Sequence, residues 1–570
     1  MHRVADAPRC CGGRARYRCA RGRWLVAILL ALALVAAGCS SGGEEAAPEL
    51  PIDAAPTAPE PAPSEPDEPP TEELDLAGPA PRVQVEEPPP PPDGREVVVA
   101  RTQQLVAQAV QAAEDTTLGV LVTDEHGREI AAYQADDALL PASTLKIVTA
   151  AALLSTVGPE ARFTTQVETT APIDGDGVLR GDLVLVGSGD PALATDEYGR
   201  WIYPARPRTP LASLADDLVA HGLTRLEGDV IGTAPGFVGP RRAEGWPDRY
   251  FSSFDARYAS GLTVDAGLET ILTYPEPDEA GEADGAPELT DPDSDVAADT
   301  EQGQATDPEE PEDPEDLGPP DVKVDHVLDP AAHAAAELLR LLAERDVEVV
   351  GEGRSGEVDA PIIGRLARVD SPPLEELLRF AVQRSDNHLT DGLFQAVGRI
   401  RTGEGSWERG DRALRQVLDR YGIDHSGAVF ADGSGLSRDD RVAARLLVSL
   451  DRVMYAGPHA DTWDSLMAVM GESGTLRERL TGTVAAGRFR GKTGTLRDVT
   501  SLSGSVHDET GPRYHLAVIA NDADGPGRWV ARSLMDELAL QLSADVAGCT
   551  VTPGELPEDP FQIPRASIRC

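Results

Sequence analysis

Basic residues are almost absent from two long, proline-rich stretches of this chain. Residues 41–94 contain 14 Asp or Glu and a single Arg, and residues 276–321 contain 19 acidic residues and no Lys or Arg. Together they supply most of the formal net charge of −46. Stretches of this composition bury too little apolar surface to offset the entropy lost on ordering, so we expect both to be disordered linkers. The acidic balance of the remaining chain argues against a nucleic-acid partner, which would require a basic face.

The N-terminus lacks an apolar run long enough to span a membrane comfortably. Trp24–Ala37 has 14 apolar residues and follows five arginines, whereas a spanning helix needs about 20. Arginines followed by a short apolar run are typical of an export signal, which we expect over residues 1–38. Small residues precede Cys39, as in a bacterial lipobox, so we expect Cys39 to be lipidated and residues 39–95 to form an acidic tether on the extracytoplasmic side of the membrane. The alternative is an ordinary secretory signal or a short anchor helix.

Cysteine is scarce, and only Cys549 and Cys570 follow the expected lipidation site. In an exported protein, two such cysteines suit a disulfide that ties the tail, residues 549–570, to the body. Two thiols cannot complete a zinc site. The sequence therefore implies no metal and no other cofactor.

Apolar patterning predicts similar elements at both ends of the foldable part. A helix and a hairpin are expected at its start, and two strands and a helix at its end. The predicted segments are 97–114, 118–122 and 130–133, a helix entered at Pro141, and then 501–507, 514–520 and 529–542. This order favours an α+β fold with an antiparallel sheet flanked by helices, in which the first and last segments are adjacent.

A long insertion interrupts this fold. It contains a predicted strand that ends in a Gly/Asp/Pro turn at 181–191, a helix at 211–221 and a second strand near 228–232. We therefore expect a separate, mostly β inserted module with the acidic stretch as its surface loop. The expected division is a main domain of residues 96–165 and 365–548, and a module of residues 166–364 that contains the loop 276–321.

Three short motifs carry reactive side chains. Ser143 and Lys146 lie one turn apart on a predicted helix, so the amine can reach the hydroxyl and act as its base once its pKa is depressed. Alone, this pair is indistinguishable from a helix start with a solvated lysine. Ser385-Asp386-Asn387 follows a predicted helix, and Lys492-Thr493-Gly494-Thr495 precedes a predicted strand. In this order the three are similar to the Ser-x-x-Lys, Ser-Asp-Asn and Lys-Thr-Gly motifs of penicillin-binding proteins and serine β-lactamases.

The resemblance narrows to one family. One sign of this family is the long gap between the first two motifs. The others are the segments Gly181–Pro191, Asp432–Arg438, Ser473–Leu476 and Arg490–Leu496. These resemble the D-alanyl-D-alanine carboxypeptidase/endopeptidase family of class C, low-molecular-mass penicillin-binding proteins, peptidase family S13. The likeness extends from about residue 97 to 545, apart from the acidic loop. It implies peptidoglycan peptides as substrates and β-lactams as covalent inhibitors.

The resemblance also implies roles for the reactive residues. Ser143 would attack the carbonyl between the two terminal D-alanines, with Lys146 as the acylation base. Ser385 would pass a proton towards the departing D-alanine, and Asn387 would orient both the substrate and Lys146. Backbone amides of Ser143 and Thr495 would form the oxyanion hole.

The third motif is implied to bind the substrate. Lys492 and the hydroxyls of Thr493 and Thr495 would hold the terminal carboxylate, and Gly494 lies between them. Arg438 either faces the substrate side chain or stabilises its own loop, and the sequence leaves both open.

Four further positions are weighed against the family pattern. Asp386 is expected to be structural, because the chemistry uses the hydroxyl and the amide on either side of it. His388 is also expected to be structural, since no matching acid is evident and a lysine already supplies the base. In the relatives an acidic residue that recognises the amine of the peptide side chain usually follows the strand at 228–232, but here Thr233 takes that place. Phe237 is a possible contact for the side chain of the substrate peptide.

Other functions are weighed on the same residues. A class A β-lactamase needs a Glu-x-x-Leu-Asn loop, and no such string lies between His388 and Tyr421. An esterase is a second enzyme alternative, and a lipoprotein that binds peptidoglycan without turnover is the alternative from another class. Complete motifs favour the enzyme. The preference for trimming or for cutting cross-links, the oligomeric state and the role of the acidic loop stay open.

Overall fold

The computed structural model describes residues 96–274, 320–554 and 562–570. The expected signal peptide, Cys39, the tether and nearly all of the acidic loop 276–321 lie outside the described residues. No helix among the described residues is both long enough and apolar enough to cross a membrane.

A six-stranded antiparallel sheet forms the centre of the main part, in the order β15-β16-β17-β18-β1-β2. β1 pairs with β18 along its whole length, from Thr117 opposite Asn521 to Asp124 opposite Tyr514. The N-terminal hairpin and the C-terminal strands are therefore adjacent, as expected. The strands are β1 (Thr117–Asp124), β2 (Glu129–Tyr133), β15 (Ala468–Val469), β16 (Phe489–Leu496), β17 (Val499–Asp508) and β18 (Gly511–Asn521).

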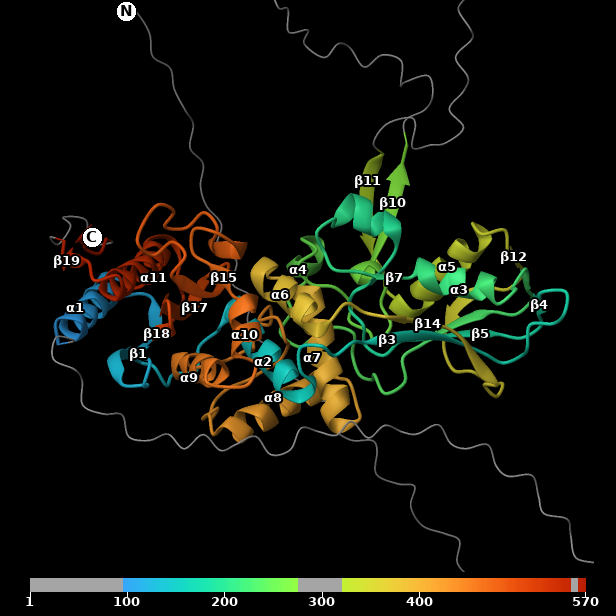
Figure 1. Ribbon diagram of the computed structural model, residues 1–570, viewed down its shortest axis with the longest axis horizontal. Helices are drawn as coiled ribbons and strands as arrows, with labels where there is room; N and C mark the ends of the chain where they lie inside the picture. The colour runs from blue at the N-terminus through green and yellow to red at the C-terminus, as the bar shows by residue number, and fades with distance from the viewer. Residues whose placement is uncertain (1–95, 275–319, 555–561) are drawn as a thin grey trace, which may run out of the picture. The chain divides into compact units, whose positions relative to one another are not determined.

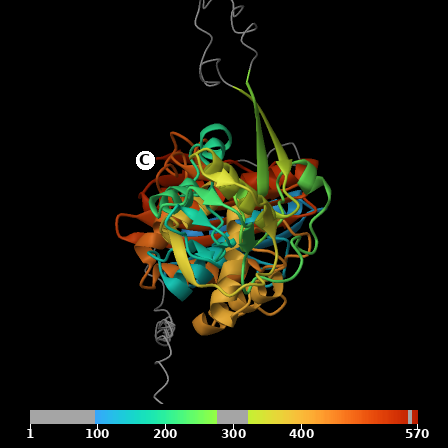
Figure 2. The ribbon, with the colours of Figure 1, turned by 90° about the vertical axis from the view of Figure 1, so that its right-hand side faces the viewer.

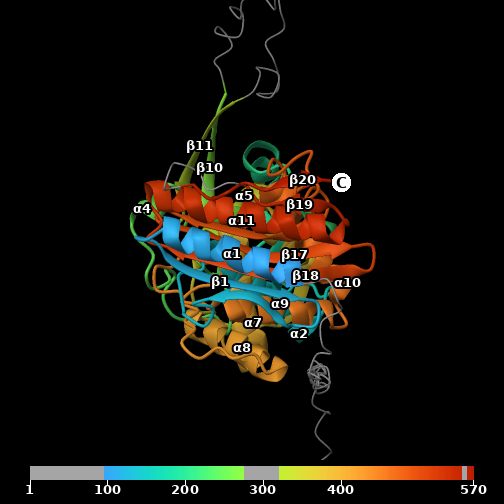
Figure 3. The ribbon, with the colours of Figure 1, turned by 90° about the vertical axis from the view of Figure 1, so that its left-hand side faces the viewer.

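Two helices cover one face of this sheet. α1 (Glu96–Ala112) and α11 (Gly525–Val546) lie side by side across the strands (Figure 3). Because side chains alternate along a strand, Leu118, Val120 and Val122 of β1 all face these helices and share their apolar cluster.

A larger helical layer covers the other face. Its members are α2 (Lys146–Val157), α6 (Leu374–Arg384), α7 (Asn387–Thr402), α8 (Trp407–Tyr421), α9 (Ala444–Tyr455) and α10 (Ala460–Leu466) (Figure 1). α2 lies among α6, α7, α8 and α9, and nearly all of its residues are buried. Leu121 of β1 belongs to this second cluster, which confirms that β1 is buried on both faces.

The inserted residues build a second set of sheets. A five-stranded sheet in the order β13-β9-β5-β3-β14 packs against α3 (Ala212–Ala220) and α5 (Pro330–Ala343) around an apolar cluster of its own. The strands expected at 181–186 and 228–232 are β5 and β9, which pair in parallel. The strands are β3 (Thr164–Thr169), β5 (Leu183–Val186), β9 (Val230–Thr233), β13 (Gly353–Ser355) and β14 (Gly364–Asp370), with the three-stranded sheet β12 (Glu348–Val349), β8 (Arg225–Leu226) and β4 (Val178–Leu179), and the pair β6 (Leu193–Ala194) and β7 (Thr209–Pro210).

Two short antiparallel pairs complete the described structure. β10 (Leu268–Thr273) and β11 (Asp321–His326) form a two-stranded ribbon whose ends lead into the acidic stretch (Figure 2). β19 (Thr550–Thr552) pairs with β20 (Ser567–Arg569), and next to them Cys549 and Cys570 form a disulfide that links the tail to the end of α11.

Candidate active site

Ser143 lies in a tight turn between β2 and α2. The sequence predicted a continuous helix from Pro141, but residues Ala142–Leu145 form a 3₁₀ turn and the α-helix begins at Lys146. Ala142 has φ of 49°, a strained value for a residue with a Cβ. Hydroxyls of Thr144 and Ser501 both donate to the carbonyl of Pro141, at 2.7 and 2.6 Å, and hold the turn in place.

Lys146 points at the Ser143 hydroxyl from within the protein core. Its side chain is completely buried, and its Nζ donates to Ser143 Oγ at 3.1 Å, to Asn387 Oδ1 at 2.8 Å and to the backbone carbonyl of Ser434 at 2.7 Å. These three acceptors match the three protons of an ammonium. Burial lowers the pKa of Lys146 to about 8, although nearby carboxylates, first Asp391 and then Asp432, act in the opposite direction. A neutral amine is therefore within reach near physiological pH.

The second and third motifs contact each other through Ser385 and Lys492. Ser385 caps the end of α6, and Lys492 of β16 donates from Nζ to Ser385 Oγ at 3.0 Å and to its neighbour's carbonyl, Thr493 O, at 2.7 Å. Lys492 is fully buried, and burial together with the charge of Lys146 holds its pKa well below the ordinary value. The ammonium form of Lys492 is therefore disfavoured until an anion binds beside it.

Strand β16 approaches Ser143 closely because of a glycine. A Cβ on Gly494 would lie 2.2 Å from Ser501 Oγ and 2.9 Å from the backbone nitrogen of Ser143. β15 pairs only with Arg490 and Gly491, so within the described structure no strand pairs with the outer edge of the Lys492–Leu496 segment. An extended peptide could add to that edge.

A loop from Asp432 to Arg438 contacts Lys146 through the carbonyl of Ser434. The Asp432 carboxylate accepts backbone bonds from Ser434, Gly435 and Ser437 at 2.6–3.0 Å, and one from Trp246 Nε1 at 2.7 Å. Asp391, on α7, accepts from the backbone of Gly433 at 3.1 Å. Because these bonds fix the loop, they also fix the Ser434 carbonyl that accepts a hydrogen bond from Lys146.

The three motifs therefore converge on one serine, and comparison with known proteins identifies the family. The model of the D-Ala-D-Ala carboxypeptidase 3 (S13) family matches residues 101–542. The chain belongs to this family. It is a serine D-Ala-D-Ala carboxypeptidase, as the motifs predicted.

Individual relatives agree with this assignment. A D-alanyl-D-alanine carboxypeptidase of Actinomadura sp. (strain R39) is 31% identical over 470 residues, which cover 77% of this chain and 83% of the relative. The carboxypeptidase DacB of Mycolicibacterium smegmatis is 30% identical over 543 residues, covering 92% and 96%. The crystal structure of penicillin binding protein 4 (dacB) from Haemophilus influenzae matches with a TM-score of 0.59 at 22% identity, over 76% of this chain and 99% of that chain. This likeness confirms the expected α+β fold.

Two residues in and beside the second motif of the S13 peptidase, Asp386 and His388, have structural partners. Asp386 caps α7 by accepting from the backbone of Leu389 at 2.8 Å. His388 is buried with its Nδ1 3.5 Å from Arg206 Nη2, and burial lowers its pKa well below the ordinary value. Neither arrangement offers a base to Ser143.

Arg438 forms a two-point ion pair with Asp498, with distances of 2.7 and 2.8 Å. This geometry favours the loop-stabilising alternative, since both nitrogens that would bind a ligand are already engaged. Thr493 Oγ1 donates to Thr475 Oγ1 at 2.8 Å, while Thr495 is exposed at the end of β16.

Phe237 is half-buried and packs against glycines of the peptidase. Built Cβ atoms on Gly261, Gly405 and Gly189 would lie 2.2–2.5 Å from its ring, so the ring fills space that only glycines leave. Thr233 ends β9, and its carbonyl accepts from Gly187 at 2.9 Å.

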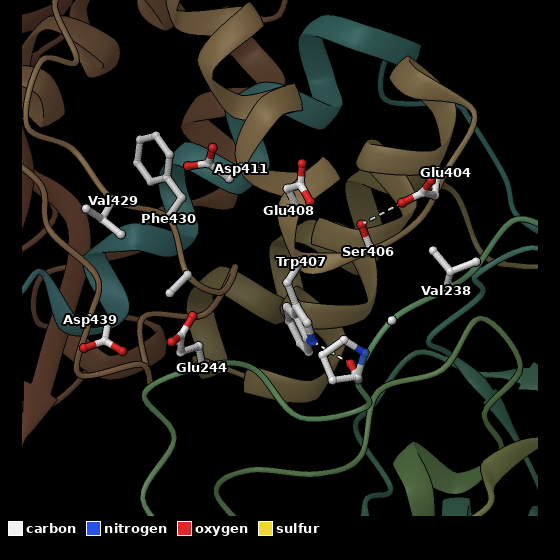
Figure 4. A pocket seen from close by; sticks show the side chains of 13 residues that line it. Val238, Glu244, Glu404, Ser406, Trp407, Glu408, Asp411, Val429, Phe430 and Asp439 are labelled. Carbon is white, nitrogen blue, oxygen red and sulfur yellow. Dashed lines mark hydrogen bonds between the residues drawn. The ribbon is translucent and has the colours of Figure 1, made fainter. Parts of the chain in front are cut away.

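A cavity of about 760 Å³ lies apart from this chemistry (Figure 4). Apolar side chains such as Trp407 and Phe430 and several carboxylates line it, and no residue of the three motifs does. The carboxylates of Glu404 and Asp411 face Arg409 and Arg415. Within the described ranges, no group of three or more His, Cys, Asp or Glu is arranged to hold a metal ion.

Sequence reasoning missed four contributors to the site: Ser434, Asp391, Trp246 and Arg206. Only Asp391 had a usable signal, because it follows Asn387 by four positions and so lies one turn along the same face of α7. Ser434 acts through its backbone carbonyl and lies in the Asp432–Arg438 segment that carried the family resemblance, although its own role was not predicted. Trp246 and Arg206 come from the inserted segment and leave no local pattern in the sequence.

Proposed function

We propose that Ser143 is the nucleophile of this peptidase and that Lys146 is its general base. The observation that carries this is the buried Lys146 amine, 3.1 Å from Ser143 Oγ and with a pKa lowered to about 8. A lysine in water would be almost entirely protonated at pH 7 and unable to accept the serine proton.

In the proposed acylation, Ser143 Oγ attacks the carbonyl carbon between the two terminal D-alanines while its proton passes to Lys146 Nζ. The tetrahedral intermediate then expels the terminal D-alanine as its C–N bond breaks. The proton taken up by Lys146 passes through the hydroxyl of Ser385 to the leaving nitrogen, which returns Lys146 to its neutral form, and the peptide remains as an ester on Ser143. Water hydrolyses this ester and restores the serine.

Substrate binding is proposed at the open edge of β16. The terminal carboxylate would lie against Lys492, Thr493 and Thr495, and its charge would stabilise the ammonium form of Lys492 that burial disfavours. Backbone amides of Ser143 and Thr495 are the proposed oxyanion donors, each worth about 100- to 1000-fold in rate. Gly494 supports this proposal, because it lets the two amides approach one another.

The peptidase works on cell-wall peptides and is therefore extracytoplasmic. We further propose that Cys39 carries a lipid that anchors it to the membrane, since small residues precede Cys39 and a Pro-rich acidic stretch follows it. The proposed organisation places the catalytic domain at 96–165 and 365–548 and the inserted module at 166–364.

Mass spectrometry of the protein after incubation with benzylpenicillin tests the nucleophile. We expect one stable adduct per chain on the parent protein, and none on the Ser143→Ala variant. A folded parent protein that forms no adduct would contradict the proposal and favour a lipoprotein that binds peptidoglycan without turnover. An adduct that survives in Ser143→Ala would assign the nucleophile elsewhere.

A further inference from the structure

Ser385 is held in a conformation that its own sequence does not favour. It has φ of 61° and ψ of 38°, in the left-handed region, although it carries a side chain. Its hydroxyl nevertheless has to meet Lys492 Nζ, which lies 3.0 Å away. Contacts outside Ser385 must therefore stabilise this backbone position.

The next residue, Asp386, lies at the junction between α6 and α7. Its backbone nitrogen donates to Ala381 of α6 at 3.1 Å, and its Oδ1 accepts from Leu389 of α7 at 2.8 Å. Ser385 and Asn387 lie on either side of this junction. A displacement of Asp386 would consequently move both the hydroxyl that meets Lys492 and the amide that meets Lys146.

The second carboxylate oxygen of Asp386 meets an arginine from the inserted segment. Arg206 lies between Tyr203 and β7, is only 3% exposed, and places its Nε 3.2 Å from Asp386 Oδ2. Its Nη2 donates to the carbonyl of Pro191 at 3.2 Å, whereas neither Nε nor Nη1 makes a hydrogen bond among the described residues, so the contact of Nε with Asp386 is an ion pair without hydrogen-bond geometry. Asp386 is thus the carboxylate that forms an ion pair with this buried guanidinium.

The inserted segment also contacts α7 directly at this point. A Cβ on Gly392 would lie 2.8 Å from Pro191 Cβ, so the turn that carries Pro191 rests on the face of α7 that glycine leaves open. Arg206 binds this same turn through the Pro191 carbonyl. Its guanidinium therefore joins the turn, the start of α7 and the Ser385–Asn387 motif.

We propose that Arg206 is a positioning residue for catalysis: through Asp386 it holds Ser385 and Asn387 in their working geometry. The inserted module then completes the active site of the main domain from a distance of about 180 positions in the chain. This inference rests on the proposed roles of Ser143, Lys146 and Ser385.

The proposal has a kinetic consequence that a general loss of stability does not share. Arg206 does not lie on β16, where the substrate carboxylate is proposed to bind, so its loss should leave KM nearly unchanged. The proton path through Ser385 and the contact of Asn387 with Lys146 depend on Arg206. The defect should therefore appear in kcat and in the rate of acylation.

The test measures kcat and KM for D-alanine release from a peptide ending in D-Ala-D-Ala, together with thermal midpoints. We expect Arg206→Met to lower kcat at least about 30-fold with KM within about threefold, since misplaced catalytic groups cost rate steeply. Arg206→Lys keeps the charge and should recover part of the loss. Arg354→Met is the matched control, because it removes another Arg–Asp pair from the inserted segment, with Asp229 at 2.8 Å, and should leave kcat unchanged.

A mutant cycle separates positioning from independent damage. Asp386→Asn can still cap α7 but leaves Arg206 without its charge partner. We expect Arg206→Met/Asp386→Asn to be no worse than the poorer single variant. If Arg206→Met does not fold, the Arg206→Lys and Asp386→Asn variants test the inference instead. We expect each of them to lower kcat at least about threefold with KM unchanged.

Two results would overturn the inference: a folded Arg206→Met or Arg206→Lys variant with kcat within about twofold of the parent, or a double variant whose loss equals the product of the single losses. Benzylpenicillin acylation of the parent is measured in the same preparations. Absence of that adduct would refute the proposed nucleophile, whereas a normal adduct with a normal Arg206→Met variant would refute only the positioning role.

Discussion

Replacing Asn387 by Asp tests whether the pKa of Lys146 controls acylation. Asn387 Oδ1 accepts from Lys146 Nζ at 2.8 Å, so the substitution puts a carboxylate of nearly the same shape beside the amine. A negative charge favours the ammonium form and must raise the pKa of Lys146. The proposed base then needs a higher pH to become neutral.

The size of the effect follows from the pKa. At pH 7, a lysine with a pKa of about 8 is neutral in about one molecule in ten. A neighbouring opposite charge shifts a pKa by about 1 to 3 units, and a shift of about 2 leaves only about one molecule in a thousand neutral. Acylation of Asn387→Asp at pH 7 should therefore fall about 100-fold. Its pH profile should move about 2 units towards alkaline pH.

The assay is the second-order rate constant for acylation by a chromogenic β-lactam, measured from pH 6 to 10. Asn387→Ala is the control, since it removes the hydrogen bonds to Lys146 and to the Asp255 carbonyl but adds no charge. Asn387→Ala should be slow without an alkaline shift. A profile for Asn387→Asp that keeps the midpoint of the parent would refute Lys146 as the base.

Two further substitutions probe close packing and the tail. Gly494→Ala should abolish acylation, because its Cβ would lie 2.9 Å from the Ser143 nitrogen and push β16 off the nucleophile; a β-lactam binding assay with normal rates would contradict this. Cys549→Ser opens a loop with a sequence separation of 21 residues, so it should weaken the tail by about 3 kcal/mol. Faster amide exchange over Thr550–Thr552 is the expected readout, and unchanged exchange would show that packing alone retains the tail.

The sequence alone was sufficient for the fold class and for the three motifs. Apolar, β-prone runs at 118–122 and 514–520 predicted two neighbouring strands of the antiparallel sheet, β1 and β18, because a short apolar run is typical of a strand buried on both faces. The spacing of Ser143 and Lys146 likewise predicted their contact. The order of the motifs was enough to indicate the family, which the comparisons confirm.

Local spacing did not predict the shape of the turn at Ser143. The residues after Pro141 have helical propensity, yet bonds from Thr144 and Ser501 to the Pro141 carbonyl hold a 3₁₀ turn instead. Nothing in the sequence around Phe237 indicated that its ring fills a space left by three glycines distant in the chain. Both outcomes depend on partners that only folding brings near.

The tertiary structure alone decided the electrostatics of the site. Burial is the main cause of the low pKa of Lys146, and Lys146 is buried because α7 and the loop from Asp432 to Arg438 close over it. The support of Asp386 by Arg206 also joins residues about 180 positions apart. Sequence spacing determines which side chains a helix or strand presents together, whereas desolvation and charge pairing depend on every element packed around them.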